Sequence, residues 1–252
     1  MINWLLFSAI AVCSYFLGNV NNAVILSKLK KNDIRKLGSG NPGTMNMSRN
    51  FGIVFGVLTL VLDAVKGIIP SLVGYFVFKG QYAVNGFFEF SDLAKYSFGL
   101  CAVLGHIYPV IYKFKGGKGI ATTIGSMFAC SITSGYEWVI VAVMAWVAAI
   151  VFIYFAEYGA MGSFIAITPP AIGQGIYLFF KYAGFKAPVS NNILYVISCL
   201  LIFLICFFTL FAHRKNIERM LSGEEHPTSI KQMVFKFKEK RRLKKLEKEQ
   251  NK

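Results

Sequence analysis

Residues 53–78 read IVFGVLTLVLDAVKGIIPSLVGYFVF, and only two of these 26 side chains carry a charge. A helix of this length, at about 1.5 Å per residue, crosses the roughly 30 Å hydrocarbon core of a bilayer with some tilt. The rest of the chain is similarly apolar, since 55% of its 252 residues are hydrophobic and only 15% are charged. This composition excludes an ordinary soluble domain and predicts an all-α, polytopic integral membrane protein.

Six more apolar stretches lie on either side of this run. They cover residues 3–27, 93–112, 120–133, 137–156, 160–182 and 192–212. Together with 53–78 they predict seven transmembrane helices. The stretch at 120–133 is the shortest, and a re-entrant half-helix is the alternative there. If residues 120–133 do not cross the membrane, another change in the number of crossings is needed to keep both chain ends on their expected sides. The Pro169–Pro170 segment is the easiest place for that change.

The basic residues indicate how these spans are oriented. Six of them crowd the region after the first span: Lys28, Lys30, Lys31, Arg35, Lys36 and Arg49. By the positive-inside rule this region is cytoplasmic, so we expect the N-terminus outside and the C-terminus in the cytoplasm. The absence of Lys or Arg before the first span argues against a cleaved signal peptide. The loop at 79–92, which holds Lys79, Glu89 and Asp92, is then external.

A polar, glycine-rich turn stands between the first span and the run at 53–78. It reads Gly38-Ser39-Gly40-Asn41-Pro42-Gly43-Thr44-Met45-Asn46. Glycines take positive φ readily and turn backbone N–H groups inward, which builds an anion cradle. Lys36 and Arg49 flank the turn, so phosphate is the expected ligand. The letters also fit GxGxxG, but no strand precedes them as a dinucleotide fold requires, and a plain surface loop is the other alternative.

Two further polar clusters lie beside later spans. Gly105-His106-Ile107-Tyr108-Pro109 leads into Phe114-Lys115-Gly116-Gly117-Lys118-Gly119, and His213-Arg214-Lys215-Asn216 follows the last span. The second cluster differs from a P-loop, because Gly119 stands where Ser or Thr is needed. Seven crossings place all three clusters on one side of the membrane.

The two charges of the run at 53–78 are Asp63 and Lys66. Ionisable residues inside a span are rare and costly unless they pair or serve a site. Their i, i+3 spacing places them on one helix face, where they either orient the bundle or support a site.

The charge is distributed unevenly along the chain. The net charge is +15, and residues 213–252 hold 13 Lys or Arg against 6 Asp or Glu. We therefore expect a membrane domain at 1–226 and a basic cytoplasmic tail at 227–252. Its run 235–242 either lies on anionic lipid as a helix or is a solvated, disordered tail. The five cysteines lack paired spacing and are interpreted as packing residues, and we expect no metal, no cofactor and no nucleic-acid partner.

Four segments in order resemble the signatures of one family: Gly38–Arg49, Leu62–Gly67, Gly105–Thr122 and His213–Arg219. They look like those of the acyl-phosphate:glycerol-3-phosphate acyltransferases, the PlsY family of bacterial plasma membranes. The resemblance implies a seven-helix enzyme that moves a fatty acyl group from acyl phosphate to the sn-1 hydroxyl of glycerol 3-phosphate. Lysophosphatidic acid and phosphate are the products, and the implied partners are membrane lipid and an upstream enzyme that makes acyl phosphate.

The resemblance also implies roles for individual residues. Ser39, Arg49, Lys118, His213 and Asn216 are placed in a glycerol-3-phosphate pocket, and the turn at 38–43 frames the acyl-phosphate head. The proton acceptor is either the substrate phosphate or His106, whose unperturbed pKa is near 6.5; a helix-end residue that bonds a loop is the other interpretation of His106. Asp63 and Lys66 support the site within the membrane. The implied catalytic residues are thus Ser39, His106, Arg49 and Lys118, and the implied substrate-binding residues are Gly38, Gly40, Asn41, Gly43, Thr44, Asn46, Gly116, Gly117, His213, Asn216 and Glu218.

One departure and two rivals accompany this interpretation. The family pattern has Gly-Ala-Thr-Asn after the proline, whereas here Gly43-Thr44-Met45-Asn46 moves the hydroxyl one place earlier. A transporter or flippase for a phosphorylated solute or lipid is one rival, although we find no internal repeats. An acyl-CoA-dependent acyltransferase is the other, because His213 and Glu218 stand five positions apart, which is the spacing of a His-x4-Asp dyad with Glu in place of Asp.

Overall fold

The protein is described by a computed structural model for residues 2–83, 87–183, 193–224, 228–232, 234–235, 237–239 and 242–243. Positions 236, 240 and 241 of the run at 235–242 lie outside the described residues, and its described positions are helical. Apart from one isolated bridge between Tyr82 and Glu89, the regular structure of the described residues is helical. Its elements are α1 (Trp4–Asn19), α2 (Asn22–Leu29), η1 (Ile34–Lys36), α3 (Thr44–Phe51), α4 (Ile53–Phe78), α5 (Phe90–Ile107), η2 (Val110–Tyr112), α6 (Ile120–Ser134), α7 (Tyr136–Ala156), α8 (Gly159–Leu178), the π-helix η3 (Phe179–Ala183), α9 (Ile193–Phe211) and α10 (Arg214–Leu221).

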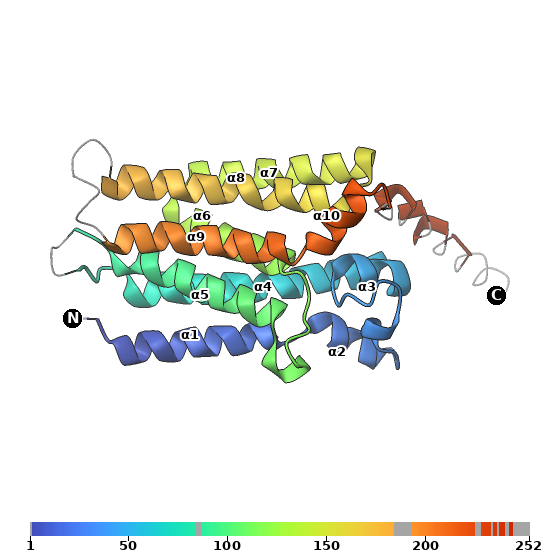
Figure 1. The fold of residues 1–252 in the computed structure, drawn as a ribbon, viewed down its shortest axis with the longest axis horizontal. Helices are drawn as coiled ribbons and strands as arrows, with labels where there is room; N and C mark the ends of the chain where they lie inside the picture. The colour runs from blue at the N-terminus through green and yellow to red at the C-terminus, as the bar shows by residue number, and fades with distance from the viewer. Residues whose placement is uncertain are drawn as a thin grey trace.

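The long helices lie lengthwise beside one another (Figure 1). Among the described residues, five helical segments are long and apolar enough to cross a membrane: Trp4–Leu29, Ile53–Phe78, Tyr136–Ala156, Gly159–Tyr182 and Ile193–Phe211. Helix α6 is shorter, with 15 residues, and α8 continues through Pro169 and Pro170. The chain is therefore an all-helical integral membrane protein.

Helix α5 is the central element and is almost entirely buried. It packs against α1, α4, α6 and α9, so its side chains contact protein on most sides rather than lipid. This explains how α5 holds Asp92, Lys95 and His106 inside an otherwise apolar bundle. It ends at Ile107, five residues before the predicted boundary, because Pro109 disfavours helical backbone at the residue before it.

Helices α4 and α6 are in backbone contact. A Cβ at Gly67 would lie 2.0 Å from the Thr122 carbonyl oxygen, and one at Gly125 would lie 1.9 Å from the Ala64 carbonyl oxygen. Small residues are what allow helices to approach this closely in a membrane. The short helix α6 is thereby held against α4, alongside the Asp63–Lys66 segment.

The first predicted span, 3–27, is not a single helix. Helix α1 ends at Asn19, and α2 begins after Asn21, whose side chain accepts a hydrogen bond from the Val24 N–H at 3.0 Å. The freed Val20 carbonyl accepts a hydrogen bond from Lys66 Nζ at 2.7 Å. Backbone groups inside a membrane need such a substitute partner when a helix is interrupted. The break therefore depends on a charge from α4, which the apolar pattern of the span does not reveal.

Candidate functional site

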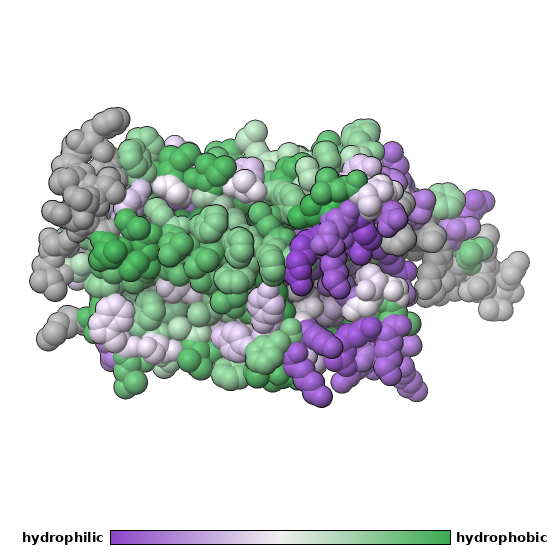
Figure 2. Space-filling view, in the orientation of Figure 1, coloured by the Kyte–Doolittle hydropathy of each residue, from purple (hydrophilic) through white to green (hydrophobic). Residues whose placement is uncertain are grey.

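The three predicted polar clusters gather at one end of the bundle. Figure 1 shows α2, α3, the loop before α6 and α10 at the same end, opposite the N-terminus. In Figure 2 the hydrophilic surface is concentrated at this end, and the apolar surface covers the body of the bundle beside it. A polar end adjoining a lipid-facing body suits a reaction between a water-soluble molecule and a lipid.

The glycine-rich turn has the backbone geometry that its sequence predicts. Gly38 and Gly40 have φ of +53° and +69°, values that strain other residues. A Cβ at Gly38 would also lie 2.4 Å from Asn46 Oδ1. Gly43 is extended and precedes α3, so Thr44 is the first residue of that helix. The turn therefore leads its backbone into a helix N-terminus, where an anion is favoured.

Asn46 organises this turn from the inside. Its Oδ1 accepts a hydrogen bond from the Ser39 N–H at 3.2 Å, and its Nδ2 donates to the Leu37 carbonyl at 2.9 Å. The side chain is buried, and Asn50 Nδ2 donates to its Oδ1 at 3.0 Å. Asn46 is one of the residues predicted to bind substrate, and in this structure its side-chain amide contacts the backbone of Ser39 and Leu37.

An ion pair stands before the turn. Asp33 accepts hydrogen bonds from the Arg35 guanidinium, the shortest at 2.6 Å, and this hydrogen bond lowers the pKa of Asp33 to about 2. The Arg35 guanidinium is thus paired with Asp33. Its Cζ also lies over the Tyr112 ring, 5.5 Å from the ring centroid. These contacts tie η1 to η2, so the first and second clusters are joined.

Arg49 lies on α3 and reaches a residue that the sequence pattern did not single out. Its Nη2 donates a hydrogen bond to Thr228 Oγ1 at 3.2 Å, and the Thr228 N–H donates to the Glu157 carbonyl at 2.7 Å. Thr228 is buried, although it was assigned to a separate basic tail. The beginning of that tail packs on the membrane domain, and an isolated threonine beyond the family signatures offers no local signal of this contact.

The Asp63–Lys66 pair is formed and extends to His106. Lys66 Nζ lies 2.8 Å from Asp63 Oδ1, and Asn22 Nδ2 donates to the same carboxylate oxygen at 2.9 Å. The ammonium also lies 3.1 Å from His106 Nδ1, besides its bond to Val20. Lys66 thus has one acceptor for each of its three protons: a carboxylate, a carbonyl and an imidazole nitrogen.

This arrangement determines the tautomer of His106. Because Nδ1 accepts from the ammonium, the proton of the neutral ring is on Nε2. A Cβ at Gly117 would lie 2.3 Å from that Nε2, so glycine is needed there. The Gly117 N–H donates to the His106 carbonyl at 3.1 Å, and the Gly116 N–H donates to the Ile107 carbonyl at 3.2 Å. His106 therefore sits under the second glycine cluster and directs an N–H toward it.

The third cluster meets the second through Lys118, whose Nζ donates a hydrogen bond to Asn216 Oδ1. Nearby, His213 is buried and its Nδ1 lies 2.9 Å from the Thr209 carbonyl oxygen. A carbonyl only accepts, so Nδ1 of His213 carries a proton. Glu218 lies further along α10. The structure thus brings together Lys118, His213 and Asn216, three of the residues predicted to bind glycerol 3-phosphate.

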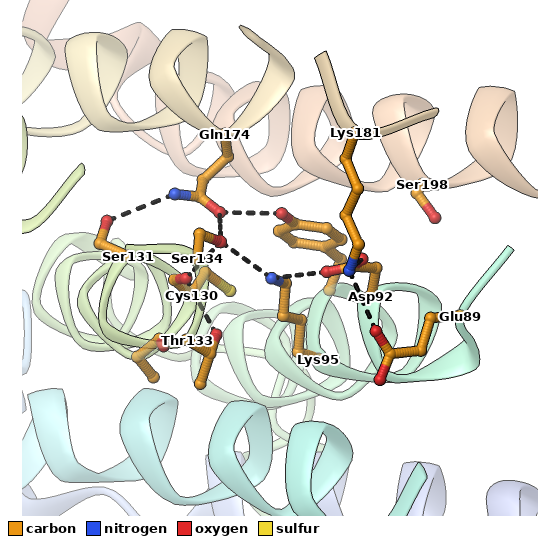
Figure 3. Close-up of polar contacts among 12 residues, drawn as sticks. Glu89, Asp92, Lys95, Cys130, Ser131, Thr133, Ser134, Gln174, Lys181 and Ser198 are labelled. Atoms are coloured by element: carbon orange, nitrogen blue, oxygen red, sulfur yellow. Dashed lines mark hydrogen bonds and ion pairs between the residues drawn. The ribbon is translucent and has the colours of Figure 1, made fainter. Parts of the chain in front are cut away.

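A second buried polar network lies at the other end of the bundle, and sequence reasoning missed it. Figure 3 shows Asp92, Lys95, Gln174 and Lys181 pointing toward one another from α5, α8 and η3. Asp92 lies 2.7 Å from Lys95 Nζ and 2.8 Å from Lys181 Nζ, and it accepts a hydrogen bond from Tyr182. Asp92 was predicted to lie in an external loop, whereas it lies in the first turn of α5 and is fully buried.

The described part of the chain contains no group of three or more His, Cys, Asp and Glu side chains arranged to hold a metal ion. The site is composed instead of glycine turns, amides, imidazoles and cations, which are the groups that bind phosphate.

Comparison with known proteins assigns the family. The family model for glycerol-3-phosphate acyltransferase matches residues 8–223. The chain belongs to this family. Among its curated members, the glycerol-3-phosphate acyltransferase of Mycoplasmopsis pulmonis is 34% identical over 217 residues, covering 86% of this chain and 91% of the relative. The protein of the same name from Aquifex aeolicus is also 34% identical, over 86% of this chain and 96% of the relative.

Solved structures in the glycerol-3-phosphate acyltransferase family are similar over nearly the whole chain. A crystal structure of PlsY, an integral membrane glycerol 3-phosphate acyltransferase in its glycerol 3-phosphate form, has a TM-score of 0.68 and 31% identity. It covers 91% of this chain and 98% of that one. The lysophosphatidic acid form of PlsY has a TM-score of 0.66 and 29% identity. This acyltransferase therefore shares the helical membrane fold of PlsY.

Proposed function

We propose that this protein transfers a fatty acyl group from acyl phosphate to the sn-1 hydroxyl of glycerol 3-phosphate. The observation that carries the proposal is the convergence of three phosphate-suited clusters at one polar end of an apolar bundle in a member of this family. Both substrates carry phosphate, so the reaction needs two anion sites beside lipid. The products are lysophosphatidic acid and inorganic phosphate, and the reaction belongs to phospholipid biosynthesis.

The chemistry needs no covalent enzyme intermediate. The sn-1 oxygen attacks the acyl carbon, the bond from that carbon to the phosphate oxygen breaks, and phosphate leaves with its electron pair. An acyl phosphate is a mixed anhydride with a good leaving group, so positioning and electrostatic stabilisation supply most of the rate. The N-terminus of α3, into which the first glycine turn leads, and the cations of Arg49 and Lys118 supply that stabilisation.

Individual residues take their roles from this scheme. Lys118, Asn216 and His213 bind glycerol 3-phosphate together with Ser39 and Arg49. The Lys118–Asn216 contact supports a joint pocket between the loop before α6 and the start of α10. The turn at 38–43 binds the acyl-phosphate head. Asn46 acts by holding Ser39 in place, and Asp63 and Lys66 act through His106.

The proton of the attacking hydroxyl goes to the substrate phosphate. This assignment is supported by the hydrogen bond from Lys66 to His106 Nδ1, which leaves Nε2 of the neutral ring protonated and unable to accept. His106 then donates from Nε2 toward the second glycine cluster.

The topology proposed with this function has seven crossings, an external N-terminus and a cytoplasmic C-terminus. It is supported by the antiparallel succession of α1, α4, α5, α6, α7, α8 and α9 in Figure 1 and by the basic residues of α2 and η1. The site then faces the cytoplasm of a bacterial cell, where glycerol 3-phosphate and an acyl-phosphate-forming enzyme are its partners.

The test uses the full chain purified in mild detergent without added metal. Palmitoyl phosphate and palmitoyl-CoA are compared as donors to glycerol 3-phosphate, and lysophosphatidic acid and phosphate are measured. Turnover with palmitoyl phosphate alone supports the proposal. Turnover with palmitoyl-CoA alone overturns the assignment of acyl phosphate as the acyl donor. If folded protein is inactive with both donors, transport of a phosphorylated compound becomes the better hypothesis.

Site variants test the assigned residues in the same assay. Ser39→Ala, Arg49→Ala and Lys118→Ala are expected to lower kcat/KM by about a hundredfold or more, because each removes a group that positions or neutralises phosphate. Lys113→Ala, a change to a neighbouring basic residue outside the proposed pocket, is the matched control. Near-normal activity in the three variants would remove these residues from the site.

A further inference from the structure

The two cations proposed to neutralise phosphate each bond to a residue near the C-terminal end of the chain. Lys118 Nζ donates a hydrogen bond to Asn216 Oδ1 on α10, and Arg49 Nη2 donates to Thr228 Oγ1 at 3.2 Å. Asn216 lies within the residues that the family model matches, which end at 223, and Thr228 lies beyond them. The partner of Arg49 therefore belongs to a part of the chain that the family match does not cover.

Residues 228–232, which we call the C-terminal strap, pack on the turn between α7 and α8. Thr228 and Ser229 are buried, and the Thr228 N–H donates to the Glu157 carbonyl at 2.7 Å. Glu157 ends α7 in the left-handed conformation, with a φ of +59°. Such a conformation is uncommon for a residue other than glycine and is costly for the backbone. The α7–α8 turn thus holds a strained residue whose carbonyl accepts the strap.

A glycine and two aromatic rings add to this contact. A Cβ at Gly159 would lie 2.9 Å from Thr228 Oγ1, so a side chain there would displace the hydroxyl. Lys231 Nζ lies over the Tyr154 and Phe155 rings, 4.8 and 5.6 Å from their centroids, which is the geometry of a cation–π contact. The strap is therefore held by its backbone, by a buried hydroxyl and by a lysine, all against the end of α7 and the start of α8.

The strap joins two parts of the bundle. Arg49 belongs to α3, which packs against α4, whereas α7 and α8 pack against each other and against α6. The Thr228 hydroxyl contacts Arg49 from a backbone that is bonded to the α7–α8 turn. It therefore links the helix that follows the first glycine turn to the α7–α8 pair.

The orientation of an arginine matters when it binds phosphate. The guanidinium is planar, and its N–H groups meet two phosphate oxygens only when that plane is correctly turned. Ordering a long, flexible side chain at the moment of binding lowers affinity. A hydrogen bond to a buried hydroxyl orders the Arg49 guanidinium before the substrate arrives.

We propose that the C-terminal strap is part of the glycerol-3-phosphate site and that Thr228 is a positioning residue for Arg49. Thr228 acts through the guanidinium and not on the reacting atoms. The inference rests on the proposed acyl transfer and adds to it a residue that sets the affinity for glycerol 3-phosphate. Binding of the acyl donor does not depend on this contact.

Two Thr228 variants test the hydroxyl in detergent. Thr228→Val is expected to raise KM for glycerol 3-phosphate up to about fivefold, because one hydrogen bond that orders Arg49 is lost. The kcat and the KM for palmitoyl phosphate should change by less than about twofold, because the donor site is intact. Thr228→Ser keeps the hydroxyl and should restore KM to within about twofold of the unaltered protein. An unchanged KM in Thr228→Val, or no recovery in Thr228→Ser, overturns the proposal.

A double-mutant cycle separates this role from a merely structural one. In an Arg49→Ala background the hydroxyl has no guanidinium to position, so adding Thr228→Val should change KM for glycerol 3-phosphate by less than about twofold. A strap that only stabilises the fold would give the same rise in KM in both backgrounds, and that result overturns the proposal. Gly159→Ala, which displaces the same hydroxyl, should raise KM as Thr228→Val does and add nothing to it.

Hydrogen exchange on the unaltered protein avoids dependence on variant folding. If the Thr228 contact favours binding of glycerol 3-phosphate, the ligand must favour the contact equally, because coupling is reciprocal. Saturating glycerol 3-phosphate, with binding verified by calorimetry, is therefore expected to slow exchange of the Thr228 amide up to about fivefold. The Ala83 amide, which donates to the Phe88 carbonyl at the other end of the bundle, is the control. Unchanged exchange at Thr228 overturns the proposal, and faster exchange would show that its hydroxyl competes with phosphate for Arg49 and would overturn it too.

The two proposals fail in different ways. Slower exchange at Thr228 with glycerol 3-phosphate, but no lysophosphatidic acid from any donor, overturns the reaction and leaves the role of the strap standing. Normal acyl transfer with an unchanged KM in Thr228→Val and unchanged exchange overturns the role of the strap and leaves the reaction standing.

Discussion

Two buried Asp–Lys pairs with the same i, i+3 spacing lie at opposite ends of this bundle. Asp63 and Lys66 of α4 are 2.8 Å apart, and Asp92 and Lys95 of α5 are 2.7 Å apart. All four side chains are nearly or completely buried. As sequence patterns the two pairs are equivalent, and only their third partners distinguish them.

Those partners give the pairs different roles. Lys66 reaches His106, which lies under Gly117 of the site. Lys95 reaches Ser134 Oγ at 3.0 Å, which in turn donates to Gln174 Oε1, also at 3.0 Å (Figure 3). The first pair connects α4 to the site, whereas the second joins α5, α6 and α8 to one another. A buried ion pair therefore indicates function only when its network leads to a site.

The largest expected contrast is between the two lysines. Lys66→Met is expected to destabilise the protein by about 3–5 kcal/mol, because it leaves Asp63 charged and buried. It should also lower kcat/KM by up to about tenfold, because His106 loses its anchor and replacing the histidine itself is expected to cost no more than this. Lys95→Met should cost less stability, since Lys181 stays within 2.8 Å of Asp92, and should leave kcat/KM within about twofold. Thermal unfolding and kcat/KM per folded molecule measure the two effects.

Double variants are the control for this prediction. Removing both charges, as in Asp63→Asn with Lys66→Met or Asp92→Asn with Lys95→Met, should restore stability at either end. Activity should stay low for the first double variant and normal for the second. Recovery of activity with stability in the first would make the Asp63–Lys66 pair purely structural.

Two glycines provide a second contrast. A Cβ at Gly117 would lie 2.3 Å from His106 Nε2, and one at Gly74 would lie 2.7 Å from the Ala94 carbonyl carbon. Gly117→Ala is expected to lower kcat/KM by about tenfold to a hundredfold, because an ångström of displacement at a site has such an effect. Gly74→Ala should lower the unfolding temperature and leave kcat/KM unchanged. Equal kinetic effects would show that the packing of α4 on α5 reaches the site.

The proton assignments provide a third and smaller contrast. His106→Gln is expected to lower kcat by less than about tenfold, because the proposed acceptor is the substrate phosphate and a general base contributes a hundredfold or more. Tyr182→Phe removes a donor to Asp92 and should cost about 1–3 kcal/mol of stability without altering kcat. A hundredfold loss in His106→Gln would establish the histidine as the base.

The smallest expected effect concerns two threonines. Thr228→Val removes the hydrogen bond to Arg49, worth about 1 kcal/mol, and should raise KM for glycerol 3-phosphate up to about fivefold. Among the described residues, Thr133 Oγ1 bonds to carbonyls of its own helix, so Thr133→Val at the other end is the matched control and should leave KM unchanged. An unaltered KM in Thr228→Val would show that Arg49 acts without this contact.

Local patterns were sufficient for much of this molecule. Apolar run length predicted α4 over its full range and α7, α8 and α9 to within a few residues, because a helix in lipid satisfies its own backbone and needs only apolar side chains. Glycine spacing predicted the turn at Gly38 and Gly40, because glycine is the residue that adopts positive φ without steric strain. The i, i+3 spacing likewise predicted the Asp63–Lys66 contact.

Tertiary structure decided what those elements contact. The break between α1 and α2 depends on Lys66, the position of Arg49 depends on Thr228, and Asp92 is buried because α8 and η3 bring Gln174 and Lys181 against α5. Each of these contacts joins residues far apart in the chain, and no local periodicity encodes such a partner. The sequence by itself therefore determined the membrane class, the helices and the residue types of the site. Packing alone decided which buried ion pair faces the site and which only holds the bundle together. The difference lies in the residue that each lysine meets beyond its aspartate, His106 for Lys66 and Ser134 for Lys95.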